Sequence, residues 1–318
     1  MNIPALLEEL ISEIRKNIFY CPYSGLLNGK MGIIILLYVY ARFSGDKQAL
    51  SCADELIDDL LRSLSSDKTI DFETGVSGIA WGLDYLLSEK YIEMDDKDFI
   101  FDTFDNLIFE TKKTWAGTID DLSMGIYIAC RLRQDKSSSL WQKRAAGYLQ
   151  KVKMGFDNRY VRNALSVYPA SAFYPFYNCI GEWSDIPDLR LSGQEIAQGL
   201  DVFVDIAIRE EKNKTDRVFM CGLRAAVTGD GGNKKETLSI YKSSDITLLE
   251  INKYYLYRLL YKRNDPLPDN YGLRLNDFIN SPDLFEIRSL SSPLNIGLKN
   301  HQSGLAWSLL QYVKDSSF

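Results

Sequence analysis

The chain has 318 residues, 46% of them hydrophobic and 12% aromatic, which is enough to bury a core in one large domain or two ordinary ones. Its 37 Lys and Arg residues stand against 43 Asp and Glu residues, and the net charge of -6 argues against nucleic-acid and membrane partners. The N-terminus lacks the basic start and apolar run of a signal peptide, and no stretch is long and apolar enough to cross a bilayer. We therefore expect a cytoplasmic protein.

In the first half of the chain, two kinds of predicted helix alternate. Amphipathic segments with one apolar stripe are expected at residues 3–18, 50–64 and 101–108. Each is followed by a segment that is apolar almost all round, as is typical of a helix enclosed by other helices: residues 31–43, 78–87 and 126–132. The pairs recur with a period of about 45 residues, which indicates a repeat architecture of outer and inner helices.

In the second half the pattern is less regular. Outer helices are expected at residues 141–156, 196–207 and 248–260, and inner partners at residues 176–183, 218–226 and 305–313. A loop-prone tract, Arg263–Gly297, precedes the last inner helix, and we assign no structure to it.

Taken together, these segments predict an all-α protein that forms one domain over residues 1–318. The expected architecture is an α/α toroid, a closed ring of about six helical hairpins in two concentric layers. An open solenoid is the nearest alternative, but its first repeat would need a polar cap, and residues 33–40 are apolar.

Glycine turns precede the inner helices. Residues 25–32 and residues 297–304 share the pattern Gly-Leu-x-Asn-x-x-x-Gly, and Gly75 and Gly78 pair in the same way before the second inner helix. The first glycine permits a tight turn, while the later one lies in the first helical turn and lets a neighbour approach closely.

These glycine turns resemble the repeats of the lanthionine synthetase C-like (lanthipeptide cyclase) family. The resemblance is clear in the first three repeats and the last one. It implies a toroid with the turns at the mouth of a central cavity. Family enzymes add a peptide cysteine thiol to a dehydrated serine or threonine. A zinc ion, held by two cysteines and a histidine in Trp-Cys-x-Gly and Cys-His-Gly segments, makes the thiol nucleophilic.

The zinc-binding segments of that family are not matched here. Met220-Cys221-Gly222 is a partial match to the first segment, and the single histidine, His301, follows Asn300 instead of a cysteine. We therefore expect no metal and no other cofactor. His301 occupies the slot that Gly29 fills in the first repeat, and the five cysteines are spread singly, with no C-x-x-C pair.

Candidate site residues lie mostly in the glycine turns. The resemblance makes Asp71 an acid/base candidate, with helix capping as the alternative, and Cys221 and His301 are the remaining catalytic candidates. The candidates for substrate binding are Asn28, Lys30, Glu73, Trp81, Asp120, Asp121, Asn300 and Trp307. Each polar one could instead be a cap or a solvated residue, and the two tryptophans could fill the core.

Three functional hypotheses follow. The first is a protein of bacterial peptide modification that binds a precursor peptide or a partner enzyme at the mouth of the toroid without zinc-dependent thioether cyclisation. The second is an active lanthionine cyclase with atypical thiol activation. The third is a carbohydrate-acting toroid hydrolase that uses Asp71 or Glu73 with Asp120 and Asp121 as paired carboxylates.

Overall fold

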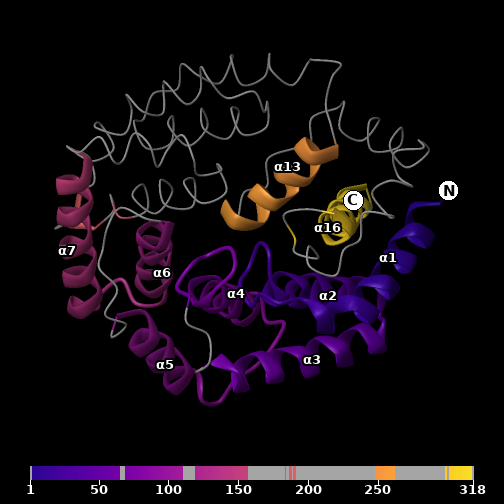
Figure 1. Ribbon diagram of the computed structural model, residues 1–318, viewed down its shortest axis with the longest axis horizontal. Coiled ribbons are helices and arrows are strands. Elements are labelled where there is room, and N and C mark those ends of the chain that lie inside the picture. The colour runs from indigo at the N-terminus through magenta and orange to yellow at the C-terminus, as the bar shows by residue number, and fades with distance from the viewer. Residues whose placement is uncertain are drawn as a thin grey trace, which may run out of the picture. The chain divides into compact units, whose positions relative to one another are not determined.

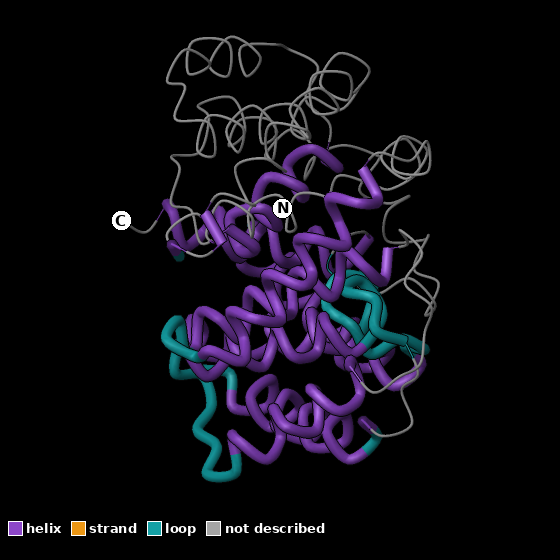
Figure 2. The backbone as a smooth tube through the Cα atoms, turned by 90° about the vertical axis from the view of Figure 1, so that its left-hand side faces the viewer, coloured by secondary structure: helices purple, strands orange, loops and turns teal. Residues whose placement is uncertain are grey.

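The computed structural model describes residues 2–64, 69–109, 119–156, 183, 186, 187, 189, 190, 248–261, 298 and 301–316. Within these ranges every regular element is helical and no strand occurs, so the predicted all-α class is confirmed for this part of the chain (Figure 2). None of the helices in these ranges has the length and apolar character needed to span a membrane.

The chain forms two compact units. Residues 1–111 and 244–318 make up the first unit, and residues 112–243 make up the second. The first unit therefore contains both ends of the chain. The single domain and the fully closed ring stay predictions.

Helices of the first unit fall on the predicted segments. They are α1 (Ile3–Asn17), η1 (Ile18–Tyr20), α2 (Lys30–Ser44), α3 (Lys47–Arg62), α4 (Val76–Ser88), α5 (Lys97–Phe109), α13 (Leu248–Tyr261) and α16 (His301–Ser316) (Figure 1). The second unit contains α6 (Ile119–Gln134) and α7 (Ser139–Phe156). The expected segments 176–183, 196–207 and 218–226, apart from Trp183, and the tract Arg263–Gly297 lie outside the described residues.

Burial confirms the expected difference between the two kinds of helix in the first unit. Every residue of α2 from Met31 to Ala41 is buried, as a helix with neighbours on all sides requires. In α3, by contrast, the buried residues are Ala49, Ala53, Leu56, Ile57 and Leu60, which recur at three- and four-residue spacing on one face.

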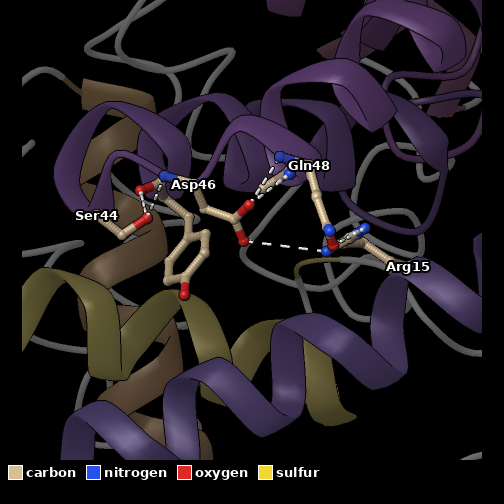
Figure 3. Close-up of polar contacts among 6 residues, drawn as sticks. Arg15, Ser44, Asp46 and Gln48 are labelled. Carbon is tan, nitrogen blue, oxygen red and sulfur yellow. Dashed lines mark hydrogen bonds and ion pairs between the residues drawn. The ribbon is translucent and has the colours of Figure 1, made fainter.

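A two-residue link joins α2 to α3. Gly45 ends α2 with a φ of 77°, a left-handed conformation that glycine adopts without strain. The next residue, Asp46, caps α3 by accepting hydrogen bonds from the backbone N–H groups of Gln48 (2.8 Å) and Ala49 (3.1 Å). Arg15 of α1 lies beside this cap, because its guanidinium donates to Gln48 Oε1 at 3.1 Å (Figure 3).

The packed hairpins run from an inner helix to the outer helix that follows it. In the first unit α2 packs on α3 and α4 packs on α5, while in the second unit α6 packs on α7. The alternating pattern predicted that each outer helix pairs with the inner helix after it, and this prediction was wrong for α1. α1 packs mainly against α16, the last helix of the chain.

The third inner helix begins earlier than expected. The sequence analysis placed Asp120 and Asp121 in a turn before the helix, whereas α6 already begins at Ile119. The two aspartates thus lie in the first helical turn.

Candidate functional site

Two glycine-containing loops pair with each other through their backbones in the first unit. The first loop, residues 21–29, leads into α2, and the second loop, residues 69–75, leads into α4. Hydrogen bonds run from Gly25 N to the Thr74 carbonyl (2.8 Å), from Leu26 N to the Phe72 carbonyl (3.3 Å) and from Leu27 N to the Glu73 carbonyl (3.1 Å). A Cβ on Gly25 would lie 2.4 Å from the carbonyl carbon of Thr74, so a side chain there would push the loops apart.

A side-chain hydrogen bond reinforces this pairing. The amide Nδ2 of Asn28 donates to Oε2 of Glu73 at 2.8 Å, and the Asn28 backbone N–H donates to the Glu73 carbonyl at 3.0 Å. The Glu73 side chain is buried, with 7% of its surface exposed, whereas Asn28 is half-buried and reaches the surface. Two predicted binding residues from different repeats therefore lie together, and the bond to a carboxylate is of the stronger kind.

Asp71 shapes the second loop. Its Oδ1 atom accepts hydrogen bonds from the backbone N–H groups of Glu73 (2.6 Å) and Thr74 (3.1 Å), a local turn typical of aspartate. The first residue of α4, Val76, instead donates its backbone N–H to the Thr69 carbonyl at 2.9 Å. These bonds to Asp71 therefore hold the loop that carries Glu73. A role of Asp71 as an acid or base stays a prediction.

Glycines in the first turns of α2, α4 and α16 occupy equivalent positions. A Cβ on Gly32 or Gly78 would lie 2.1 Å from the carbonyl oxygen of Leu26 or Phe72, and one on Gly304 would lie 2.9 Å from that of Leu298. In each repeat the glycine thus lies against the carbonyl six positions before it. Only glycine, which has no Cβ, can approach the carbonyl this closely.

Leucine side chains join successive repeats at these glycines. Cβ of Leu26, in the first repeat, would be 3.1 Å from a Cβ on Gly78 in the second. Leu298 of the last repeat contacts the first repeat in the same way. Its Cγ atom would be 2.8 Å from a Cβ on Gly32. The N-terminal ends of α16, α2 and α4 are therefore neighbours, in that order.

The two predicted binding tryptophans also occupy equivalent positions, in α4 and α16. Trp81 is 4% exposed and stacks on Tyr85 with 5.7 Å between the ring centroids. Trp307 is 2% exposed and donates its indole N–H to the backbone carbonyl of Tyr255 in α13 at 3.2 Å. Both rings pack within the first unit, and a role in binding stays a prediction for them.

Cys21 begins the first loop, and Lys30 directly follows it. Lys30 is half-buried at the start of α2 and donates its backbone N–H to the Tyr23 carbonyl at 3.0 Å. Burial raises the pKa of the Cys21 thiol, an effect that the nearby Lys30 charge opposes. A neutral, buried thiol is a poor nucleophile.

The side chains of the other predicted site residues are not among those that the structure describes. Asp120 and Asp121 belong to α6 of the second unit, and their side chains are not described. Cys221 and Asn300 lie outside the described residues, and His301 begins α16 with a side chain that is likewise not described.

The donor set needed for the zinc site of family enzymes is incomplete in the sequence. The chain has one histidine, which directly follows Asn300 instead of a cysteine, and Cys221 follows Met220 where that family has tryptophan. In the described ranges no three His, Cys, Asp or Glu side chains are grouped so as to bind a metal ion. The residues do not fit a site built from two thiolates and one imidazole.

Sequence reasoning missed two contributors to this region. Ser24 and Thr74 are half-buried beside the paired residues, and Ser24 N donates to the Thr74 carbonyl at 3.1 Å. It also missed the bond between α1 and α16, in which the Gln302 amide donates to Glu13 at 3.0 Å. The position of Ser24 and Thr74 beside Gly25 and Gly75 was the available signal for the first pair.

The fold and the loops define a class: an all-α repeat protein whose inner helices begin at paired glycine loops. The family model described as lanthionine synthetase C-like protein matches residues 3–157, which take in α1 to α7. The match covers just under half of the chain, and it supports membership of that family. No curated protein and no solved structure matches the chain.

Proposed function

We propose that this lanthionine synthetase C-like protein takes part in bacterial peptide modification by binding a precursor peptide at the paired first and second loops. The observation that carries the proposal is the joining of Asn28 and Glu73 across two repeats. The joined loops, at the starts of α2 and α4, bring together four half-buried polar residues on a hydrogen-bonded backbone: Ser24, Asn28, Asp71 and Thr74. Such groups pair with the backbone and hydroxyl groups of a peptide at little entropic cost.

Binding without zinc-dependent thioether cyclisation is the second part of the proposal. It rests on the chain having a single histidine and no Cys-His pair. A thiol with a pKa of about 8.5 is mostly protonated at neutral pH. Without the family's metal ligands the chain lacks the usual means of making the peptide thiolate. We further propose that the protein acts in the cytoplasm.

Calorimetry with the peptide acetyl-Ser-Ala-Ser-Ala-Cys-amide tests the binding. We expect wild-type protein to bind it and Asn28→Ala to weaken binding about tenfold, which corresponds to one lost hydrogen bond of about 1.4 kcal/mol. Ser51→Ala, on the exposed face of α3, is the matched control and leaves the affinity unchanged. Equal affinities of wild type and Asn28→Ala would reject the loops as the binding site.

Metal analysis of the purified protein tests the second part. We expect no stoichiometric zinc and no loss of free peptide thiol when a peptide containing dehydroalanine and cysteine is added. One equivalent of zinc that disappears on changing Cys221 or His301 to alanine would overturn it and favour an active cyclase.

A further inference from the structure

Three exposed aromatic side chains lie within five residues, two of them just before the first loop and one within it. Phe19 is 66% exposed, Tyr20 is 67% exposed and Tyr23 is 47% exposed. The other large hydrophobic side chains exposed in the described ranges are Phe43, Leu50, Phe99 and Leu140, which are scattered along the chain. We call Phe19, Tyr20 and Tyr23 the aromatic patch.

The backbone under the aromatic patch is held in place. Ile18 and Cys21 are buried, and Cys21 N donates to the Ile18 carbonyl at 3.0 Å, which closes the turn of η1. The carbonyl of Tyr23 accepts the N–H of Lys30, so the patch is tied to the start of α2. A fixed backbone presents aromatic rings to a ligand with little loss of conformational entropy.

We propose that the aromatic patch binds an apolar side chain of the same peptide whose polar groups contact the first and second loops. This inference rests on the proposed function and adds the class of side chain that the site selects. Tyr23 belongs to the first loop, and the next two residues, Ser24 and Gly25, donate their backbone N–H groups to the Thr74 carbonyl.

The size of the aromatic patch favours a short peptide segment over a folded partner. At about 200 Å² for each aromatic side chain, the exposed fractions amount to roughly 300 to 400 Å². A stable interface between folded proteins, including a second copy of this chain, needs about 800 Å² on each partner.

Charge sets a further condition on the peptide. The first and second loops contain two carboxylates, Asp71 and Glu73, and the one basic residue beside them is Lys30 at the start of α2, which leaves the region net negative. An acidic segment would meet repulsion there, so the apolar side chain is expected within an uncharged or basic stretch of peptide.

The test compares two peptides that differ in one side chain, acetyl-Ser-Ala-Ser-Ala-Cys-amide and acetyl-Ser-Phe-Ser-Ala-Cys-amide. Calorimetry is expected to give about tenfold tighter binding of the phenylalanine peptide to the wild-type protein. Changing Phe19, Tyr20 and Tyr23 together to alanine should abolish this preference, so that the variant binds the two peptides with equal affinity. Phe99→Ala, an exposed phenylalanine on α5, is the control that keeps the preference.

The outcomes separate this inference from the proposed function. If Asn28→Ala weakens both peptides while the triple variant keeps the preference, the patch is rejected and the loop site stands. No preference in the wild-type protein also rejects the patch. If the wild-type protein binds neither peptide, both the proposed function and this inference are rejected.

Discussion

Leu298 of the last repeat packs against Gly32 of the first repeat, in the same relation in which Leu26 of the first packs against Gly78 of the second. The two ends of the chain therefore meet as consecutive repeats. α16 lies against both α1 and α2, and the bond from Gln302 to Glu13 joins it to α1 (Figure 1). This meeting of first and last repeats is the contact that a ring of helices requires where its ends join.

Replacing the repeat glycine should damage the fold. In Gly32→Ala the new Cβ would lie 2.1 Å from a backbone oxygen that cannot move alone, so we expect a loss of about 2 to 3 kcal/mol in the free energy of unfolding. Gly147→Ala is the control, because nothing lies within 4 Å of a Cβ at this exposed position of α7. It should gain about 0.5 to 1 kcal/mol. Urea unfolding measures both, and equal effects would contradict the close approach.

Coupling between Asn28 and Glu73 should be measurable. A double-mutant cycle of Asn28→Ala and Glu73→Gln is expected to give an interaction free energy of about 1 to 2 kcal/mol, since the bond is charge-assisted and its acceptor is buried. The exposed pair Ser51 and Glu55 in α3, cycled in the same way, should give less than about 0.5 kcal/mol. Additive effects of the first two changes would show that the loops do not depend on this bond.

Predictability differed between the fold and the site for a physical reason. Apolar periodicity marks which faces are buried, and it located α2 and α3 correctly. It does not say which helix provides the burial: the predicted ring brings the last helix to the first repeat, but the pattern did not show that α1 itself packs on α16. In the same way, the sequence placed Asn28 and Glu73 in glycine turns, but their mutual bond depends on how neighbouring repeats align.

The stability of the protein should fall at alkaline pH. Burial, reinforced by the hydrogen bond from Tyr38 to Asp54 at 2.7 Å, raises the pKa of Tyr38 far above the ordinary value of about 10. Above that pH the unfolded chain loses the phenolic proton while the folded chain keeps it. Unfolding then becomes more favourable as pH rises.

Variants at this pair test the alkaline effect. In urea midpoints measured from pH 9 to 11, Tyr38→Phe should show a shallower decline than wild type because it has no proton to lose. Asp54→Asn keeps the burial but removes the carboxylate, so its decline should be intermediate. Identical slopes for all three proteins would exclude Tyr38 as a source of the effect.

Thiol reactivity should follow burial. Cys21 and Cys130 are buried, whereas Cys52 is partly exposed. In native protein at pH 7.5, iodoacetamide is expected to alkylate Cys52 before Cys21, and in urea the two should react alike. Peptide mass spectrometry measures both rates. Fastest alkylation at Cys21 would contradict its assignment as a buried, neutral thiol and favour a cyclase with atypical thiol activation.

Hydrogen–deuterium exchange with acetyl-Ser-Phe-Ser-Ala-Cys-amide most directly tests the claim that the paired loops form the peptide-binding site. We predict that the peptide slows exchange in residues 21–31 and 69–76. Residues 44–48 and 89–91, at the opposite ends of α2 and α4, should exchange as before. Slower exchange at those opposite ends, with unchanged loops, would contradict the account.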